Sequence, residues 1–304
     1  MADQSQTRAA PLAGLPQGAQ ADEAEATAGT DNVPYDKRKL SYAGTFTNPW
    51  QSFVIRTVEW CTGKITLLRR IREFERMGPA TGQEFWAQAR GLMRIDLLTP
   101  EQEIANIPES GPVVVVANHP HGLVDGMMLA ELIGARRNDY KILTRSLLTG
   151  VDEVSQYMIP VPFPHEEDSF QKSLDMRKEA MQHLADGGVI VVFPSGAVAA
   201  SETMWGPAIE GEWNPFTAKM IQRSGATVVP VKFPGQNSRP YQIANQISAT
   251  LRQGLLIHEV AHAFGKPQRP IIGEAIEPET LKEKGKNPRD FMAWLRERTM
   301  GLKG

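Results

Sequence analysis

The chain has 304 residues, of which 41% are hydrophobic and 22% are charged, and its formal net charge at pH 7 is −2. This length and hydrophobic content allow a sizeable core, and the charge gives no indication of a nucleic-acid-binding protein. The single cysteine, Cys61, excludes an intramolecular disulfide, and no apolar run reaches the roughly 18 to 20 residues that a membrane-spanning helix needs.

The first 40 residues differ in composition from the rest of the chain. They are rich in Ala, Gly, Gln, Asp and Glu and contain few large apolar side chains. Such a segment cannot bury enough apolar surface to offset the entropy lost on ordering. We therefore expect residues 1–40 to form a disordered tail.

A long amphipathic helical pattern begins at Asn48-Pro49. Val54, Val58 and Ile65 belong to an apolar set that recurs at spacings of three and four, which places the set on one helix face. Between positions 56 and 76 the sequence contains six Arg and Lys residues but only three Glu residues. Basic, tryptophan-bearing amphipathic helices are typical of membrane surfaces, although a helix docked on the protein with a solvated basic face shows the same pattern. We expect residues 48–98 to form a membrane-associating helical segment, and both interpretations can hold at once.

Strands and helices alternate over the remaining residues, 99–304, which we expect to form the catalytic domain. Four consecutive valines at 113–116 are typical of a strand buried on both faces, and Pro120 ends the run because it lacks a backbone N–H. Further strands are predicted at residues 139–144, 189–193, 227–232 and 269–273, and helices at 127–133, 169–186, 213–223, 240–263 and 288–300. The alternation predicts an α/β fold in which helices flank a mainly parallel sheet on both faces.

Two residues suited to acid–base chemistry follow the predicted central strand. His119 and Asp125 lie at its carboxyl end, where open α/β sheets place their ligands. A neutral imidazole held by a carboxylate can act as a general base that removes a hydroxyl proton near pH 7. A turn histidine beside an N-capping aspartate is the alternative without a function. His121 is a rival base, since only three residues separate it from Asp125.

Residues 118–126 carry a resemblance to a known family. Asn118-His119, followed by Asp125 and a helix, resembles the first motif of the glycerolipid acyltransferase superfamily, which includes the 1-acylglycerol-3-phosphate acyltransferases. That motif usually has four residues between His and Asp, and five stand here. The same spacing is found in the hemolysin-like, lyso-aminolipid branch, whose motif His-Pro-x-Gly-x-x-Asp-Gly matches residues 119–126 at every fixed position. The resemblance implies that His119 is the general base and that Asp125 orients it.

A second and a third motif appear in family order. Phe193-Pro194-Ser195-Gly196 resembles Phe-Pro-Glu-Gly-Thr-Arg, with Ser in place of Glu and residues 197–198 in place of Thr-Arg. In the family that Arg helps to hold the acceptor's phosphate, so its absence argues against phosphatidic-acid chemistry. Backbone donors at residues 193–196 are expected to stabilise the oxyanion.

The third motif covers residues 229–238. Its Pro-Val, Phe-x-Gly and Asn-Ser elements resemble the hemolysin-like branch, and residues 271–276 resemble the family's final strand. Asn237 and Ser238 can recognise a polar head group, or they can cap the next helix.

Lys141 and Arg145, expected at the end of a neighbouring strand, can replace the missing Arg, or they are surface cations that close the strand. The motifs together predict a set of substrate-binding residues: Asn118, His121, Gly122, Lys141, Arg145, Phe193, Pro194, Ser195, Gly196, Lys232, Asn237 and Ser238.

Three other classes of protein fit the sequence less well. A serine hydrolase elbow needs Gly where Phe193 and Ala197 stand beside Ser195. His119-x-His121 also opens metal-dependent hydrolases, but the other histidines are not expected to converge on it, so no metal site is predicted. A lipid-binding module without activity would have no need for the His/Asp pair.

The sequence thus predicts an O-acyltransferase. Acyl-ACP or acyl-CoA is the expected donor, and no further cofactor is expected. The acceptor is a lysolipid, preferably a lyso-aminolipid of the ornithine-lipid type; 1-acyl-sn-glycerol-3-phosphate is the alternative acceptor. We expect peripheral attachment to the cytoplasmic face of a bacterial inner membrane and no nucleic-acid partner.

Overall fold

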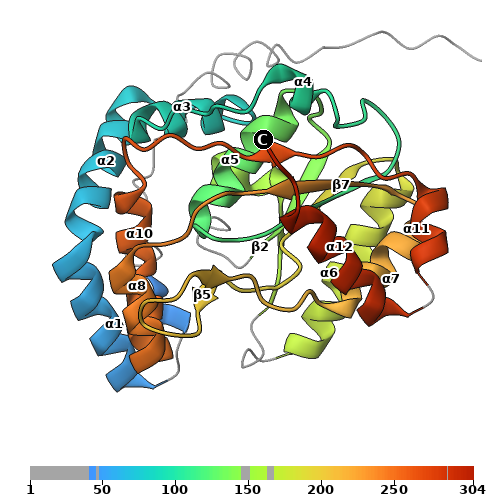
Figure 1. Cartoon of the computed structure of the whole chain (residues 1–304). Coiled ribbons are helices and arrows are strands. Elements are labelled where there is room, and N and C mark those ends of the chain that lie inside the picture. Colours follow the sequence, from blue (N-terminus) through green and yellow to red (C-terminus); the bar gives the residue numbers. More distant parts are fainter. Residues whose placement is uncertain (1–40, 46–47, 145–150, 163–167, 286) are drawn as a thin grey trace, which may run out of the picture. The chain divides into compact units, whose positions relative to one another are not determined.

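The computed structural model describes residues 41–45, 48–144, 151–162, 168–285 and 287–304 (Figure 1). The tail expected over residues 1–40 lies outside the described residues. The chain divides into Met1–Val33 and Pro34–Gly304, and the second unit, described here on its own, contains every element named below.

A six-stranded sheet forms the centre of this unit. Its strand order is β3-β2-β4-β1-β7-β8, and all neighbouring strands are parallel except β7 and β8. The strands are β1 (Val113–Ala117), β2 (Tyr140–Thr144), β3 (Met158–Pro160), β4 (Val189–Val192), β7 (Thr227–Lys232) and β8 (Ile271–Ile272). The predicted mainly parallel sheet is confirmed, and the valine strand lies in its interior.

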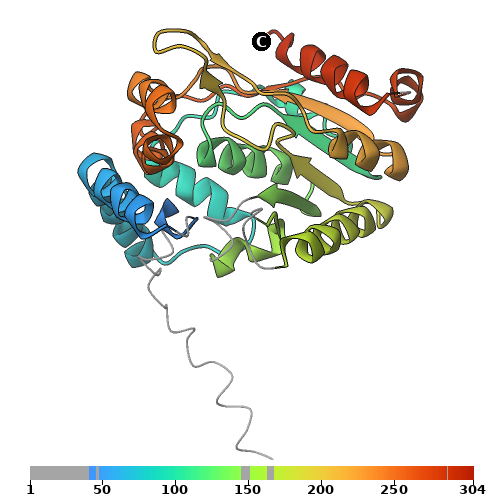
Figure 2. The ribbon, with the colours of Figure 1, turned by 90° about the horizontal axis from the view of Figure 1, so that it is seen from below.

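Helices cover both faces of the sheet, as predicted (Figure 2). Val113, Val115 and Ala117 of β1 point into a core shared with α3 (Glu84–Met93) and α5 (Leu123–Gly134). The alternate residues Val114 and Val116 point into a second core. That core is shared with α6 (Ser169–Ala185), α7 (Pro215–Ser224), α11 (Pro278–Lys284) and α12 (Pro288–Met300). A strand with both faces buried needs apolar residues at every position, which explains the unbroken valine run.

The amphipathic pattern after Asn48 forms two helices rather than one. They are α1 (Pro49–Thr62) and α2 (Lys64–Met77), and they meet at Gly63. A Cβ atom at Gly63 would lie 2.8 Å from the backbone of His258 in α10 (Leu256–His262), so only glycine permits this close approach. Asn48 caps α1 by accepting a hydrogen bond from the backbone N–H of Trp50 at 2.9 Å.

Three short helices occupy the predicted helical stretch 240–263: α8 (Arg239–Ile247), α9 (Ala249–Gly254) and α10. α1 packs on α9. Gln51 donates a hydrogen bond to Thr250 at 3.3 Å, and a Cβ atom at Gly254 would lie 3.1 Å from Val58. Helices α1 and α2 therefore lie beside α8–α10, which come much later in the sequence (Figures 1 and 2). The interpretation of α1 as a helix docked on the protein holds for its inner face.

The outer face of α1 remains exposed and apolar. Trp50 and Phe53 are 69% and 59% exposed and stack on each other, and Trp60 follows on the same side. In the part of the chain that the structure describes, no helix is long and apolar enough to cross a membrane.

The remaining described elements are short. They are η1 (Tyr42–Thr45), α4 (Glu101–Ile104), η2 (Asp152–Tyr157) and the antiparallel pair β5 (Ala200–Ser201) and β6 (Ala208–Ile209).

Candidate active site

The site is built on the turn between β1 and α5. Gly122 has φ 69° and ψ −128°, a conformation that L side chains rarely adopt, and this reverses the chain within a few residues of the strand end. Asp125 then lies in the first turn of α5, where its backbone N–H donates to Gly122 O at 3.0 Å. The turn returns the buried Asp125 carboxylate toward residues 119–121.

His119 contacts this carboxylate. Its Nδ1 lies 3.1 Å from Asp125 Oδ2, although the N–H direction falls short of a regular hydrogen bond. The imidazole stacks on Phe193, with ring centroids 4.0 Å apart. Phe193 follows β4, so the stack joins the carboxyl ends of β1 and β4. The helices that follow these two strands cover opposite faces of the sheet, which makes this point a topological switch of the kind where α/β folds bind ligands.

His121 contacts the other oxygen of the same carboxylate. Its Nδ1 lies 3.0 Å from Asp125 Oδ1, and its backbone N–H donates to Oδ2 at 2.8 Å. Two imidazoles therefore share one buried carboxylate, a feature that the sequence motif did not predict.

The shared contacts shift two pKa values. Burial alone would raise the pKa of Asp125, but the charge of His121 and the close contacts with both histidines outweigh it, so that pKa lies below its ordinary value. Burial alone would lower the pKa of His121, but the neighbouring Asp125 carboxylate raises it above its ordinary value. Asp125 is therefore ionised near pH 7 and able to orient an imidazole.

Asn118 clamps two strand ends together. Its Oδ1 accepts from the backbone N–H of Phe233 at 2.7 Å, and its Nδ2 donates to Phe233 O at 2.9 Å. Both polar atoms of the buried amide are occupied by the backbone just after β7. Asn118 was predicted to bind substrate, and its geometry is instead that of a residue that positions the third motif beside the first.

The second motif forms a tight turn. The backbone N–H of Gly196 donates to Phe193 O at 2.9 Å, and Ser195 Oγ donates to Ala197 O at 3.0 Å. Pro194 O accepts from the N–H of Asn214 at 2.9 Å. The Gly196 N–H, one of the expected oxyanion donors, is therefore already paired within the turn.

The third motif is divided between structure and site. Ser238 caps α8 and donates from its Oγ to buried Glu259 of α10 at 2.5 Å, so its hydroxyl ties two helices together. Gly235 lies against His121: a Cβ atom at Gly235 would meet His121 Nε2 at 3.0 Å. Asn237 is buried, and within the described residues its Nδ2 has no hydrogen-bond partner.

The amino groups of the two described cationic residues, Lys141 and Lys232, pair away from the histidines. Lys141 is the second residue of β2, level with Ile190 and, through it, with Val114, which precedes His119 by five residues or roughly 16 Å of strand. Its Nζ pairs with Glu179 at 2.6 Å. Lys232 Nζ donates to Leu302 O at 2.8 Å. The prediction that Lys141 lies at the end of its strand is wrong, and Arg145 lies outside the described residues.

One buried carboxylate beside the site was missed. Glu210 accepts the backbone N–H of His119 at 3.1 Å through Oε2 and the indole N–H of Trp213 at 3.1 Å through Oε1. It thereby fixes the backbone of His119, next to the Asn118 clamp. Glu210 follows a stretch with no clear periodicity, so only a three-dimensional arrangement could identify it.

The described residues contain no group of three or more His, Cys, Asp and Glu side chains that could hold a metal ion. His258 and His262 stack on each other on α10, with ring centroids 5.8 Å apart.

Comparison with known proteins identifies a family and two relatives. The model of a family described as Acyltransferase matches residues 97–303, which is well over half of the chain. A lyso-glycine lipid O-acyltransferase from Phocaeicola vulgatus is 30% identical over 145 residues, 47% of this chain and 49% of that protein. The protein of the same description from Bacteroides thetaiotaomicron is 28% identical over 159 residues, 51% of this chain and 55% of that protein. The chain thus spans about half the length of these relatives.

Among solved structures, the 1-acyl-sn-glycerophosphate (LPA) acyltransferase PlsC from Thermotoga maritima is similar, with a TM-score of 0.47 and 14% sequence identity. The match covers 85% of this chain and 83% of that one.

Proposed function

This chain belongs to the acyltransferase family, and we propose that it transfers a fatty acyl group from acyl-ACP or acyl-CoA to the hydroxyl of a lysolipid. The observation that carries the proposal is the His119 imidazole, 3.1 Å from a buried carboxylate at the carboxyl end of an interior strand. The acceptor that we propose is a lyso-aminolipid of the glycine-lipid or ornithine-lipid type.

The reaction needs one base and no covalent enzyme intermediate. As the acceptor hydroxyl oxygen attacks the thioester carbonyl carbon, Nε2 of His119 takes the hydroxyl proton. The new C–O ester bond forms and the C–S bond breaks, and the proton passes from the imidazolium to the leaving sulfur. Asp125 stabilises the imidazolium in the interval through Nδ1.

His119 is the better candidate for the base than His121. By the motif match, the base is the histidine that directly follows Asn118, and Nε2 of His121 instead lies beside Gly235 of the third motif. Nδ1 and the backbone N–H of His121 also hold both oxygens of Asp125 in place. His121 therefore serves as a residue that positions Asp125.

Three observations support a lyso-aminolipid acceptor. Ala197 and Val198 stand where a phosphate-binding family member has Thr-Arg. The amino groups of Lys141 and Lys232 are engaged by Glu179 and Leu302. Both similar proteins are described as acting on lyso-glycine lipid. A phosphate dianion favours a bidentate guanidinium, whereas an amino-acid head group can be held by neutral donors such as Asn237.

The test is an acceptor panel with purified protein. Lyso-glycine lipid, lyso-ornithine lipid and lysophosphatidic acid are supplied separately with acyl-ACP and with acyl-CoA, and the diacyl product is measured by mass spectrometry. We expect kcat/KM to be highest for a lyso-aminolipid and to survive a strong chelator. Equal or faster turnover of lysophosphatidic acid would overturn the acceptor class.

Two variants test the roles of the histidines in the same assay. His119→Ala should lower kcat by about 10²- to 10⁴-fold, because it removes the base. His121→Gln should cost about 10- to 100-fold, as is usual for a group that orients another. The reverse order would assign the base to His121.

A further inference from the structure

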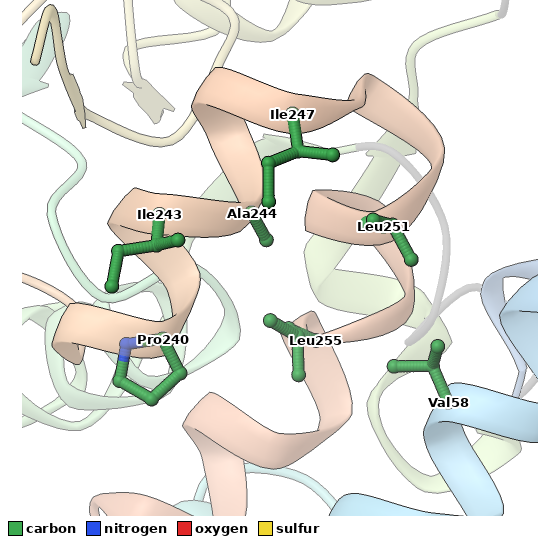
Figure 3. Close-up of a pocket in the computed structure, with 7 residues that line it drawn as sticks. All are labelled: Val58, Pro240, Ile243, Ala244, Ile247, Leu251 and Leu255. Carbon is green, nitrogen blue, oxygen red and sulfur yellow. The ribbon is translucent and has the colours of Figure 1, made fainter. Parts of the chain in front are cut away.

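An apolar groove lies between α1 and the helices α8–α10 (Figure 3). Its volume is about 400 Å³, and every described residue that lines it is apolar. Val58 comes from α1, Ile243, Ala244 and Ile247 come from α8, and Leu251 and Leu255 follow along the chain. We propose that this groove holds the hydrocarbon tail of the lysolipid acceptor, an inference that rests on the proposed function.

The chemistry of the lining selects the class of ligand. Water in such a groove finds none of the two to four polar partners that an ordered water needs. A volume of about 400 Å³ falls within the range of small-molecule sites, and an alkyl chain has only methylene groups to bury. A polar ligand would lose its hydrogen bonds on entering.

Two residues that line the groove are close in the chain to residues that contact the candidate active site. Pro240 lines the groove and lies two residues after Ser238, in the segment whose Gly235 contacts His121. Leu255 precedes Leu256, whose side chain would lie 3.9 Å from a Cβ atom at Gly122. A lipid whose tail occupies the groove therefore has its head-group end on the side of the catalytic turn.

The other features of the groove favour the acceptor over the acyl donor. Ile247 lines the groove and is 63% exposed, so the groove is open to its surroundings. The helix that supplies Val58 carries the exposed Trp50 and Phe53 on its outer face. Stacked aromatic residues of this kind suit a membrane interface. A lysolipid resides in the membrane, whereas a carrier-bound acyl group arrives from water.

The first experiment varies the tail. Wild-type protein, without an acyl donor, is titrated with lyso-glycine lipids that differ only in tail length, each below its micellar concentration. Kd should fall about fourfold with each added methylene until the groove is full, and then stay constant. A Kd that does not change with tail length would overturn the proposal.

The second experiment varies the groove. Ile247→Asp should raise Kd and KM for the longest tail at least tenfold and leave kcat within twofold of the wild type. Ala244→Met should shift the length at which Kd stops falling toward shorter tails. Leu98→Asp is the matched control, because Leu98 is also exposed, at 53%, and lies before α4, outside the groove. Equal effects of the two Asp variants would contradict the proposal.

Failure of the groove and failure of the proposed function are distinguishable. If lyso-aminolipids are turned over with no dependence on tail length or on position 247, the tail-binding role of the groove is refuted and the proposed function stands. Turnover of lysophosphatidic acid alone, with the same dependence on tail length and position 247, overturns the acceptor class and keeps the groove.

Discussion

At the scale of single residues, the site depends on one carboxylate shared by two imidazoles. Asp125 is fully buried, with His119 near one oxygen and His121 near the other. A buried charge of this kind is tolerated only when partners compensate for its lost hydration. The two histidines supply that compensation and at the same time become oriented by it. The orientation of the two histidines and the local stability of the turn therefore have the same origin.

The shifted pKa values predict how stability depends on pH. The raised pKa of His121 contributes stability that is fully present below the unfolded value of about 6.5 and is lost as the pH rises through the folded value. The lowered pKa of Asp125 contributes stability that is present above about 3.9 and is lost as the pH falls through its folded value. The contribution of the pair is therefore greatest between these limits.

Urea denaturation checks this prediction. His121→Gln should lower the free energy of unfolding more at pH 5.5 than at pH 9. In an Asp125→Asn background the same substitution should lose this pH dependence, because the partner charge is gone. A wild-type-to-variant difference that stays constant with pH would refute the assignment.

At the scale of elements, the strand-turn-helix unit β1–α5 positions the residues of the candidate site. β1 pairs residue by residue with β4 on one side and β7 on the other. The sheet therefore fixes the position of its carboxyl end. Asn118 and Glu210 then hold the turn from two sides. The turn itself depends on one glycine with a positive φ.

Two neighbouring glycines provide a matched pair of substitutions. Gly122→Ala should destabilise the protein by about 1–3 kcal/mol, because φ 69° with ψ −128° is strained for any side chain. Gly126→Ala should stabilise it by about 0.5–1 kcal/mol, because Gly126 lies within α5 and an added Cβ meets nothing within 4 Å. Thermal denaturation measures both. Equal effects would mean that backbone conformation does not limit the turn.

At the scale of the whole described unit, helix α1 presents exposed apolar side chains and also lines the lipid-tail groove. The outer face of α1 carries Trp50, Phe53 and Trp60, and the lipid-tail groove adjoins its inner face. Helix α2 continues the same segment, and its basic residues Arg69, Arg72 and Arg76 are exposed. This arrangement favours attachment to an anionic membrane surface through α1 and α2.

Vesicle sedimentation tests the attachment. The double variant Trp50→Ser/Phe53→Ser should bind vesicles containing anionic lipid at least tenfold more weakly than the wild type, because two exposed aromatic side chains no longer insert. Binding by the wild type should also weaken as salt is raised. Leu98→Ser, which removes another exposed apolar side chain outside α1 and α2, should leave binding unchanged. Unaltered binding of the double variant would exclude this face.

The sequence predicted those parts of the fold that local pattern determines. The valine run, the proline after it and the spacing from His119 to Asp125 are visible in a stretch of thirteen residues, and the strand and turn follow from them. Residues joined only by the tertiary fold were not predictable. Glu210 reaches His119 from 91 residues away, and Glu259 reaches Ser238 from another helix. Gly63 divides the long helical pattern because α10 packs against it, and no local signal indicates that contact.

The clamp made by Asn118 has a consequence for how the protein matures during translation. Its partner, Phe233, is 115 residues further along the chain. At about 5–20 residues per second, the ribosome takes on the order of ten seconds to deliver that partner after Asn118 has emerged. Throughout this interval β1 lacks its neighbour β7, and its valines present an unpaired edge of the kind on which nascent chains aggregate. In a host that translates slowly or has few chaperones, the main loss of this protein should therefore be aggregation of the nascent chain. Unfolding of the completed chain should account for less of the loss.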